Sequence, residues 1–332
     1  MMPVQPYSGY DLSEEPPTPA GATIAGFWQR LLAFAIDGMV LGILGALLGA
    51  TMFDTLAGLG AWGRLVGFVI ALAYFGTLNS SLGGGQTIGK RLLRIRVVDL
   101  AGRTISPLRA SLRHAVFGIP FFLNSAHIPV SAAPSPITIV IGFLVFGVGG
   151  ANLYLYLFNR RTRQSLPDLA AQTYVVRAQS AAAAPRVDTG IPRAHLIVVS
   201  VWLALNLIVC VLAPSLLARL GLFPDMQKLA ESLQQSGKIS TAEVQDMTFW
   251  GTGPKKRRLT VNAYWKKPPV SEQSADEVAA IALQSYPPAR KVDEIAVQVT
   301  YGFDLGFASG WQSYHAIHSP AEWEKNKEPA PR

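Results

Sequence analysis

The sequence predicts an α-helical polytopic membrane protein with about five membrane helices, one of them short or broken, and a C-terminal soluble α+β domain. Three observations lead to this fold class. Half of the 332 residues are hydrophobic, and they gather in runs of about 20 residues, the length that crosses a bilayer. Basic residues gather in two loops between those runs. After about residue 215 the chain has the mixed composition of a soluble protein.

Four apolar runs are long enough to cross the hydrocarbon core as helices. They are Leu31–Ala50, Leu65–Leu82, Ile137–Phe158 and Ala194–Ala213. A helix rises 1.5 Å per residue, so about 20 residues span the core. We therefore expect each run to be a membrane helix.

Two segments between the apolar runs carry the positive charge that gives the chain its net charge of +8, and the rest of the chain is slightly acidic. The first, residues 83–114, contains Lys90, Arg91, Arg94, Arg96, Arg103, Arg109 and Arg113 against Asp99. The second, residues 159–193, contains Arg160, Arg161, Arg163, Arg177, Arg186 and Arg193 against Asp168 and Asp188. Loops rich in Lys and Arg stay in the cytoplasm. This placement favours membrane topology over nucleic-acid binding as the origin of the positive charge.

The segment Ala115–Val130 is apolar but short, and Pro120 and Pro129 interrupt it. If it did not cross, the two basic loops would lie on opposite sides, against the charge rule. We therefore expect a short or broken helix that crosses or re-enters, and five crossings in total. The protein is then a multi-pass protein of the inner (plasma) membrane, with its N-terminus and basic loops cytoplasmic and its C-terminal domain extracytoplasmic.

Two β-strands are expected between the membrane helices. Leu92–Asp99 alternates and is β-branched, and Thr173–Val176 has the same character. If both basic loops are cytoplasmic, these strands pair and lock the loops together. On the first helix, Gly38, Gly42, Gly45 and Gly49 form a stripe that lets another helix approach closely.

The C-terminal part has the order helix, two strands, helix, two strands, which predicts a small α+β domain. The expected helices are Met226–Gln235 and Ala275–Ser285, and the expected strands are Glu243–Trp250, Arg258–Lys266, Glu294–Tyr301 and Trp311–Ile317.

Three motifs stand in order along the first half. Residues 30–37 fit R-x-x-A-x-x-x-D, residues 85–91 fit G-x-T-x-G-K-R, and residues 164–176 fit Q-x-L-x-D-x-x-A-x-T-x-V-V. Over about residues 25–178 the chain resembles the RDD family of bacterial and archaeal membrane proteins. The resemblance matches Arg30, Asp37 and Asp168 to the arginine and two aspartates of the family name. It departs at Leu166-Pro167, where the family more often has a histidine before the aspartate.

These boundaries divide the chain into five parts. We expect a disordered tail over 1–25, an RDD-like membrane domain over 26–178, a linker over 179–193, an additional membrane helix over 194–214, and the soluble domain over 215–332.

Asp37 is the most informative candidate, because a carboxylate inside a membrane helix costs a few kcal/mol and usually faces a partner or a pathway. Arg30 is two turns earlier on the same face, roughly 10 Å away, so each is expected to meet another segment. Asp37 is either an ion- or proton-binding group or a structural polar contact. Asp168 either completes a site with Lys90 or serves as a helix cap or salt-bridge partner.

Other sites are not favoured. Gly84–Lys90 spells G-x-x-x-x-G-K, but Arg91 replaces the Ser or Thr of a phosphate loop, a membrane span precedes it and a strand is expected after it. Lys90 and Arg91 are instead expected near lipid phosphates. His315 and His318 point to opposite faces of a strand, which disfavours a metal site. We expect no enzyme, no cofactor and no nucleic-acid partner.

Two functions from different classes follow. One is transport or ion exchange, with a small ion bound at Asp37, which the resemblance also implies for some members. The alternative is a non-catalytic membrane scaffold whose C-terminal domain binds a protein partner. In both, the lipid bilayer is the immediate surrounding.

Overall fold

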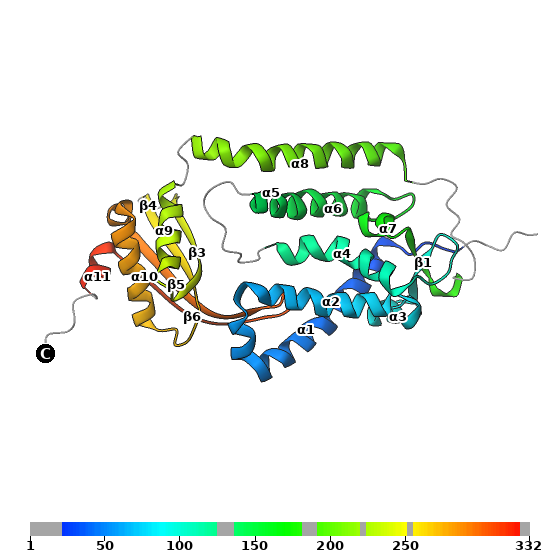
Figure 1. Cartoon of the computed structure of the whole chain (residues 1–332), viewed down its shortest axis with the longest axis horizontal. Helices are drawn as coiled ribbons and strands as arrows, with labels where there is room; N and C mark the ends of the chain where they lie inside the picture. The colour runs from blue at the N-terminus through cyan, green and yellow to red at the C-terminus, as the bar shows by residue number, and fades with distance from the viewer. Residues whose placement is uncertain (1–21, 125–135, 181–190, 220–223, 251–254, 326–332) are drawn as a thin grey trace, which may run out of the picture.

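The structure, a computed structural model, describes residues 22–124, 136–180, 191–219, 224–250 and 255–325. Four of its helices are long and apolar enough to cross a membrane: α1 (Phe27–Gly58), α2 (Gly63–Leu78) with the turn before it, the continuous α5–α6 segment (Pro136–Phe158), and α8 (Arg193–Arg219). They run side by side in one bundle (Figure 1). The polytopic helical fold is confirmed.

Helix α4 (Pro107–Leu123) lies in this bundle antiparallel to α2, and it is not among the four helices of the described residues that are long and apolar enough to cross a membrane. Gly76 near the end of α2 faces Ser111 near the start of α4. Arg64 at the start of α2 donates to the backbone oxygen of Asn124, just after α4. The chain therefore returns along α2. Residues 125–130, the last part of the segment Ala115–Val130, lie outside the described residues.

Both basic loops meet at one end of the bundle. Strand β1 (Ile95–Asp99) pairs antiparallel with β2 (Thr173–Arg177), with Val97 opposite Val175. The pairing predicted from the sequence is confirmed. The short helix α7 (Leu166–Ala170) precedes β2 at the same end.

The expectation that a strand begins at Leu92 is wrong. Residues Ile88–Leu92 form a short helix, α3, whose first turn is capped because the Thr87 hydroxyl accepts a hydrogen bond from the Lys90 amide at 3.3 Å. Arg94 then turns the chain with a φ of 53° before β1. A helix therefore does follow the G-x-x-x-x-G-K segment. The other two objections to a phosphate loop, Arg91 and the preceding membrane helix, are unaffected.

Two domain limits differ from the expected ones. Residues 22–25 do not belong to a tail, because Ile24 pairs with Val176 and the Ala25 amide donates to the Val175 carbonyl at 2.8 Å. The remainder of the expected tail (1–21), and residues 181–190 of the expected linker, lie outside the described residues. At the other end α8 continues through Pro214 to Arg219, beyond the expected residue 214.

The middle of the α5–α6 segment is π-helical over Phe143–Val148. A π turn shifts the backbone hydrogen-bond pattern and so changes which carbonyl groups are satisfied within the helix. The indole of Trp202 on α8 donates to the Gly147 carbonyl at 3.0 Å. This bond connects the additional helix to the rest of the bundle.

The C-terminal domain has the predicted order of helix, two strands, helix and two strands, and ends with one further short helix that was not predicted from the sequence. The elements are α9 (Pro224–Gln235), β3 (Ile239–Phe249), β4 (Lys256–Trp265), α10 (Glu272–Ser285), β5 (Glu294–Asp304), β6 (Ser309–His318) and the further helix α11 (Pro320–Lys325). The sheet order is β3-β4-β5-β6, with β4 and β5 parallel and the other pairs antiparallel. Helices α9 and α10 pack on the sheet around Leu259, Val278 and Ile295. The α+β expectation is confirmed.

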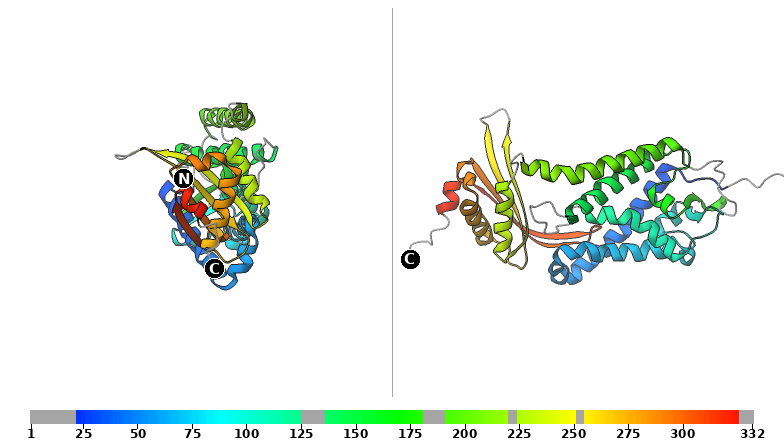
Figure 2. Two further views of the ribbon diagram at one scale, coloured as in Figure 1. Left: turned by 90° about the vertical axis from the view of Figure 1, so that its left-hand side faces the viewer. Right: turned by 45° about the horizontal axis from the view of Figure 1, so that its top comes forward.

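The β5–β6 hairpin is longer than predicted and enters the membrane bundle. The two strands extend from the sheet to α1 and α2 (Figure 2). Phe303, Leu305 and Phe307 at its tip pack against apolar side chains of both helices. The domain is therefore attached to the bundle through this hairpin as well as through α8.

Glycines make room for the hairpin. A side chain at Gly45 would overlap Ala308, and one at Gly67 would overlap the carbonyl oxygen of Leu305. A side chain at Gly38 would meet nothing within 4 Å. The expectation that the glycine stripe receives another helix is wrong, since its Gly45 and Gly49 end receives the hairpin.

Polar groups at the hairpin tip are satisfied within the protein, as buried backbone at membrane depth requires. The Arg64 guanidinium pairs with Asp304 at 2.7 Å. The Leu305 amide donates to the Ala308 carbonyl at 2.8 Å, and the Gly306 amide donates to the Asp304 carboxylate at 2.6 Å.

Candidate functional site

Asp37 lies fully buried on α1 and accepts three hydrogen bonds. The Tyr74 hydroxyl donates at 2.8 Å, the Thr87 hydroxyl at 2.6 Å and the Gly89 amide at 2.8 Å. The donors come from α2 and from the start of α3. Asp37 therefore holds the basic loop against the first helix.

The G-x-T-x-G spacing follows from this contact. Thr87 both caps α3 and donates to Asp37. Gly89 lies so close to α1 that a side chain would overlap the Ala33 carbonyl. Gly85 has a φ of 75°, which favours glycine, and a side chain there would overlap the Val97 carbonyl. Thr87 and Gly89 are thus required by the packing of the loop on α1, and Gly85 by its close approach to β1.

We predict that Asp37→Ala lowers the free energy of unfolding by about 3 kcal/mol, because three buried donors lose a charged acceptor. Thermal unfolding of the purified chain measures this loss. Asp54→Ala is the matched control, since Asp54 is an exposed aspartate of the same helix and accepts one hydrogen bond, from the Tyr301 hydroxyl at 3.2 Å, against the three at Asp37. Unchanged stability together with abolished ion flux would instead assign Asp37 to an ion pathway.

Asp168 lies at the centre of a second cluster and is fully buried. Arg30 donates to its carboxylate at 2.6 Å, and Arg113 does so at 2.7 and 3.1 Å. The Ser165 amide and hydroxyl donate at 3.0 and 2.7 Å. Burial alone would raise the pKa of Asp168, but Arg113 and Arg30 together lower it well below its usual range. The cluster joins the beginning of α1, α4 and α7.

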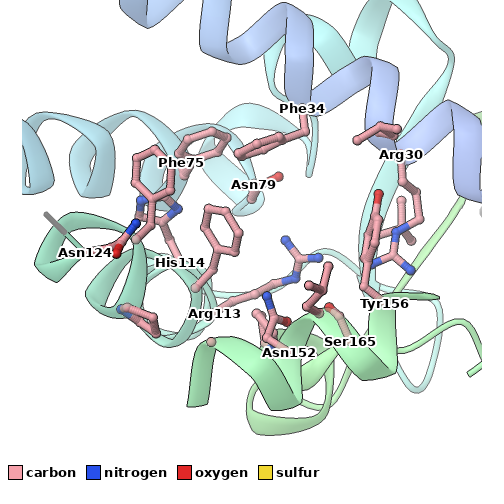
Figure 3. A pocket seen from close by; sticks show the side chains of 18 of the residues that line it. Arg30, Phe34, Phe75, Asn79, Arg113, His114, Asn124, Asn152, Tyr156 and Ser165 are labelled. Carbon is pink, nitrogen blue, oxygen red and sulfur yellow. The ribbon is translucent and has the colours of Figure 1, made fainter. Parts of the chain in front are cut away.

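A cavity of about 630 Å³ lies beside the Asp168 cluster, between α1, α2, α4 and α6. Figure 3 shows Arg30 and Tyr156 at one side of it and the Arg113 guanidinium reaching toward Asn152 and Ser165. This volume is in the range of small-molecule sites.

Three cationic side chains line the cavity, namely Arg30, Lys90 and Arg113. Asp168 pairs with both arginines, whereas Lys90 forms no ion pair within the described part of the chain. Its ammonium lies 3.5 Å from the Thr87 hydroxyl. Burial and the nearby Arg113 lower the pKa of Lys90 to about 7. The cavity therefore has an excess of positive charge.

Polar atoms without a hydrogen-bond partner among the described residues also belong to side chains of this cavity. They are Oδ1 of Asn79, Nε2 of His114 and Oδ1 of Asn152. Buried polar groups are seldom left without a partner in proteins, and such groups in a cavity indicate a bound molecule or water.

A comparison with known families finds a match to the RDD family over residues 24–172. This part of the chain is an RDD family domain. The match ends before α8 and the C-terminal domain, which lie beyond it. No curated protein and no solved structure matches the chain.

In this RDD domain the three residues of the motif do not form one site. Arg30 and Asp168 pair directly, and Asp37 lies in its own cluster with Tyr74 and Thr87. Lys90 lines the cavity, whereas the neighbouring Arg91 is exposed. The roles proposed for these residues stay predictions.

Sequence reasoning missed Arg113 as a site residue of the RDD domain. It lies on α4, one turn before Phe117, and contributes both to the Asp168 cluster and to the cavity. The available signal is a cation at the beginning of an apolar run, and the charge rule alone accounts for such a residue.

Proposed function

We propose that the RDD domain is a transport-type membrane domain that binds an anion in the cavity between α1, α2, α4 and α6. The observation that carries this proposal is the set of three cations around one cavity with one paired carboxylate. Beside apolar walls such an excess of charge favours an anionic ligand, because fewer water molecules screen it there than at an exposed surface.

The geometry leaves donors for this anion. Arg113 uses Nε and Nη2 for Asp168, and a guanidinium has five N–H donors. Lys90 contributes an ammonium group with one long contact to Thr87. Asp168 orients both arginines, so it acts as a positioning residue for the proposed site.

A cation site at Asp37 has less support. Its carboxylate already accepts from three donors whose hydrogens point at it, and a cation would have to displace them. Ion exchange through Asp37 therefore stays a hypothesis. It predicts that Asp37→Asn abolishes ion flux in vesicles, whereas an anion site predicts that flux responds to Lys90 instead.

Binding of sulfate, a simple tetrahedral oxyanion, tests the proposal. Sulfate should raise the Tm of the full-length protein in detergent, and Lys90→Gln should weaken its affinity about tenfold through loss of a charged contact. Arg91→Gln is the matched control, because Arg91 is adjacent but exposed. Equal sulfate binding by wild type and Lys90→Gln contradicts the proposal.

The lowered pKa of Lys90 gives a pH dependence. Only the protonated amine attracts an anion, so sulfate affinity should be constant below pH 7. It should decline as the pH rises above 7, where Lys90 loses its proton in the free protein, and level off after a total fall of about tenfold, because the neutral amine lacks the same charged contact that Lys90→Gln removes. Titration calorimetry measures this slope. Lys90→Arg, which stays charged, should bind sulfate without it; a slope retained in that variant excludes Lys90 as the titrating group.

We also propose that the basic end of the bundle is cytoplasmic and the C-terminal domain extracytoplasmic. The support is that β1–β2 pairing joins both basic loops at one end, and that loops rich in Lys and Arg stay inside. In intact cells a membrane-impermeant maleimide should label Glu272→Cys but not Leu100→Cys, each made with Cys210→Ser. The reverse pattern inverts the topology.

A scaffold function has one specific observation in its favour. The end of β3 exposes Phe249 and Trp250 on the C-terminal domain, and the Lys255 ammonium lies over the Trp250 ring at 4.5 Å. Large exposed aromatic side chains favour protein contacts. Cross-linking that captures the same partner from wild type and from Trp250→Ser would contradict recognition at this surface.

A further inference from the structure

We infer that the ligand of the cavity is an anionic phospholipid, with its phosphate at Arg30, Lys90 and Arg113 and one acyl chain along a wall of phenylalanines. This inference rests on the proposed anion site and adds the chemical class of the anion. It is carried by the distribution of polar and apolar side chains along the cavity.

On each of three helices the residues that line the cavity change from polar to apolar from the basic end of the bundle toward its middle. On α4, Arg113, Phe117 and Phe121 follow at intervals of four residues and all line the cavity. Residues four apart lie on one face, about 6 Å further along the axis. The wall of α4 thus passes from a cation at the basic end to aromatic rings nearer the middle of the bundle.

The other two helices show the same change. On α1, Arg30 is followed one turn later by Phe34. Helix α6 runs the opposite way, so its cavity residues are met from the basic end as Tyr156, Leu153 and, in the π-helical segment, Phe146. A phospholipid in the leaflet at the basic end has the same orientation, with its headgroup at the surface and its chains toward the midplane.

The apolar part of the cavity opens toward the surroundings of the bundle. Phe34, Phe121 and Phe146 line the cavity and are also 41%, 43% and 64% exposed. At the basic end, in contrast, α1 and α6 are in contact through the rings of Phe27 and Tyr156, 5.1 Å apart. A lipid could therefore place one chain between the phenylalanines from the side while its second chain stays in the bilayer.

The unpartnered polar atoms suit a headgroup better than a bare chain. Asn79, Asn152 and His114 line the cavity, and each has a buried side-chain atom without a hydrogen-bond partner among the described residues. The ester and hydroxyl groups of a phospholipid have both donors and acceptors. A small inorganic anion would use the cations but would leave the phenylalanine wall without a ligand group.

The test compares three ligands on the full-length protein in detergent micelles, with binding read by native mass spectrometry or fluorescence. The ligands are phosphatidylglycerol, phosphatidylcholine with the same chains, and sulfate. We expect phosphatidylglycerol to bind at least about tenfold more tightly than phosphatidylcholine or sulfate. One charged contact, or one buried acyl chain, contributes enough free energy for a difference of this size.

Two pairs of variants separate the contributions. Lys90→Gln should weaken the binding of both phosphatidylglycerol and sulfate, whereas Arg91→Gln should leave the binding of both unchanged. Phe34→Asn should weaken the binding of phosphatidylglycerol and leave the binding of sulfate unchanged. Met39→Asn is its control, because Met39 lies on the same helix, is exposed and does not line the cavity.

The outcomes distinguish the two proposals. Sulfate binding as tightly as phosphatidylglycerol overturns the lipid inference and leaves the anion site standing. Phosphatidylcholine binding as tightly as phosphatidylglycerol overturns the assignment of an anionic headgroup. Binding of neither anion overturns both proposals.

Discussion

Asp168→Asn is expected to destabilise the membrane domain by about 3–5 kcal/mol, the cost of removing one partner from a buried ion pair. Two arginines, Arg30 and Arg113, would lose their shared carboxylate while they remain buried. Arg30 at the beginning of α1 and Arg113 on α4 would then repel each other. The measurement is the Tm of the purified chain in detergent, together with its yield in the membrane fraction.

Asp99→Asn is the control for this prediction, because an asparagine keeps an oxygen acceptor for the Ala101 and Arg103 amides, and the lost ion pair is with Arg103, whose side chain is 79% exposed. Exposed pairs contribute only about 0–1 kcal/mol. If the Asp168 variant does not accumulate, the double variant Arg30→Gln/Asp168→Asn should recover part of the yield, since one buried charge is removed. Equal stability of the Asp168 and Asp99 variants would contradict the role of the cluster.

Gly67→Val is expected to expel the β5–β6 hairpin from the bundle. The added side chain would overlap the backbone carbonyl of Leu305, which no rotamer change relieves. Overpacking of this kind costs about 1–3 kcal/mol when the structure can adjust, and here the hairpin is the part able to move. Hydrogen exchange of residues 303–308 should increase strongly, because their backbone amides would become accessible to water.

Gly38→Val is the matched control, because a side chain at this glycine meets nothing within 4 Å. It should leave hydrogen exchange in the hairpin unchanged. If Gly67→Val also leaves the exchange of residues 303–308 unchanged, the hairpin does not lie between α1 and α2 in the membrane.

Much of the fold was predictable because the relevant signals are local. Runs of about 20 apolar residues identified the four long helices, and alternating β-branched residues identified β1 and β2. The charge rule then placed both strands at one end, which is what allowed their pairing to be predicted. The elements of the C-terminal domain followed from the same short-range patterns.

The insertion of the hairpin could not be predicted in this way. Residues 302–308 read as a turn between strands, and turns usually face water. Their apolar composition, with Phe303, Leu305 and Phe307, was the one sign of burial. The partner is a pair of glycine-lined helices more than 230 residues earlier in the chain, and a glycine stripe does not reveal whether a helix or a hairpin will occupy it.

The site was predictable only in part. Sequence identified the buried carboxylates, Asp37 and Asp168, because charges in apolar surroundings are conspicuous. It did not identify their partners, since Tyr74 and Arg113 come from helices whose rotation the sequence does not fix. The cavity depends on four helices at once and has no local signature.

Structure determination of the protein in nanodiscs that contain phosphatidylglycerol tests the central claim most directly. We expect density for a headgroup in contact with Arg30, Lys90 and Arg113. This density should be continuous with an acyl chain that passes Phe34 and Phe121. A cavity that contains only water in the presence of this lipid, with Lys90 turned away from it, would contradict the account.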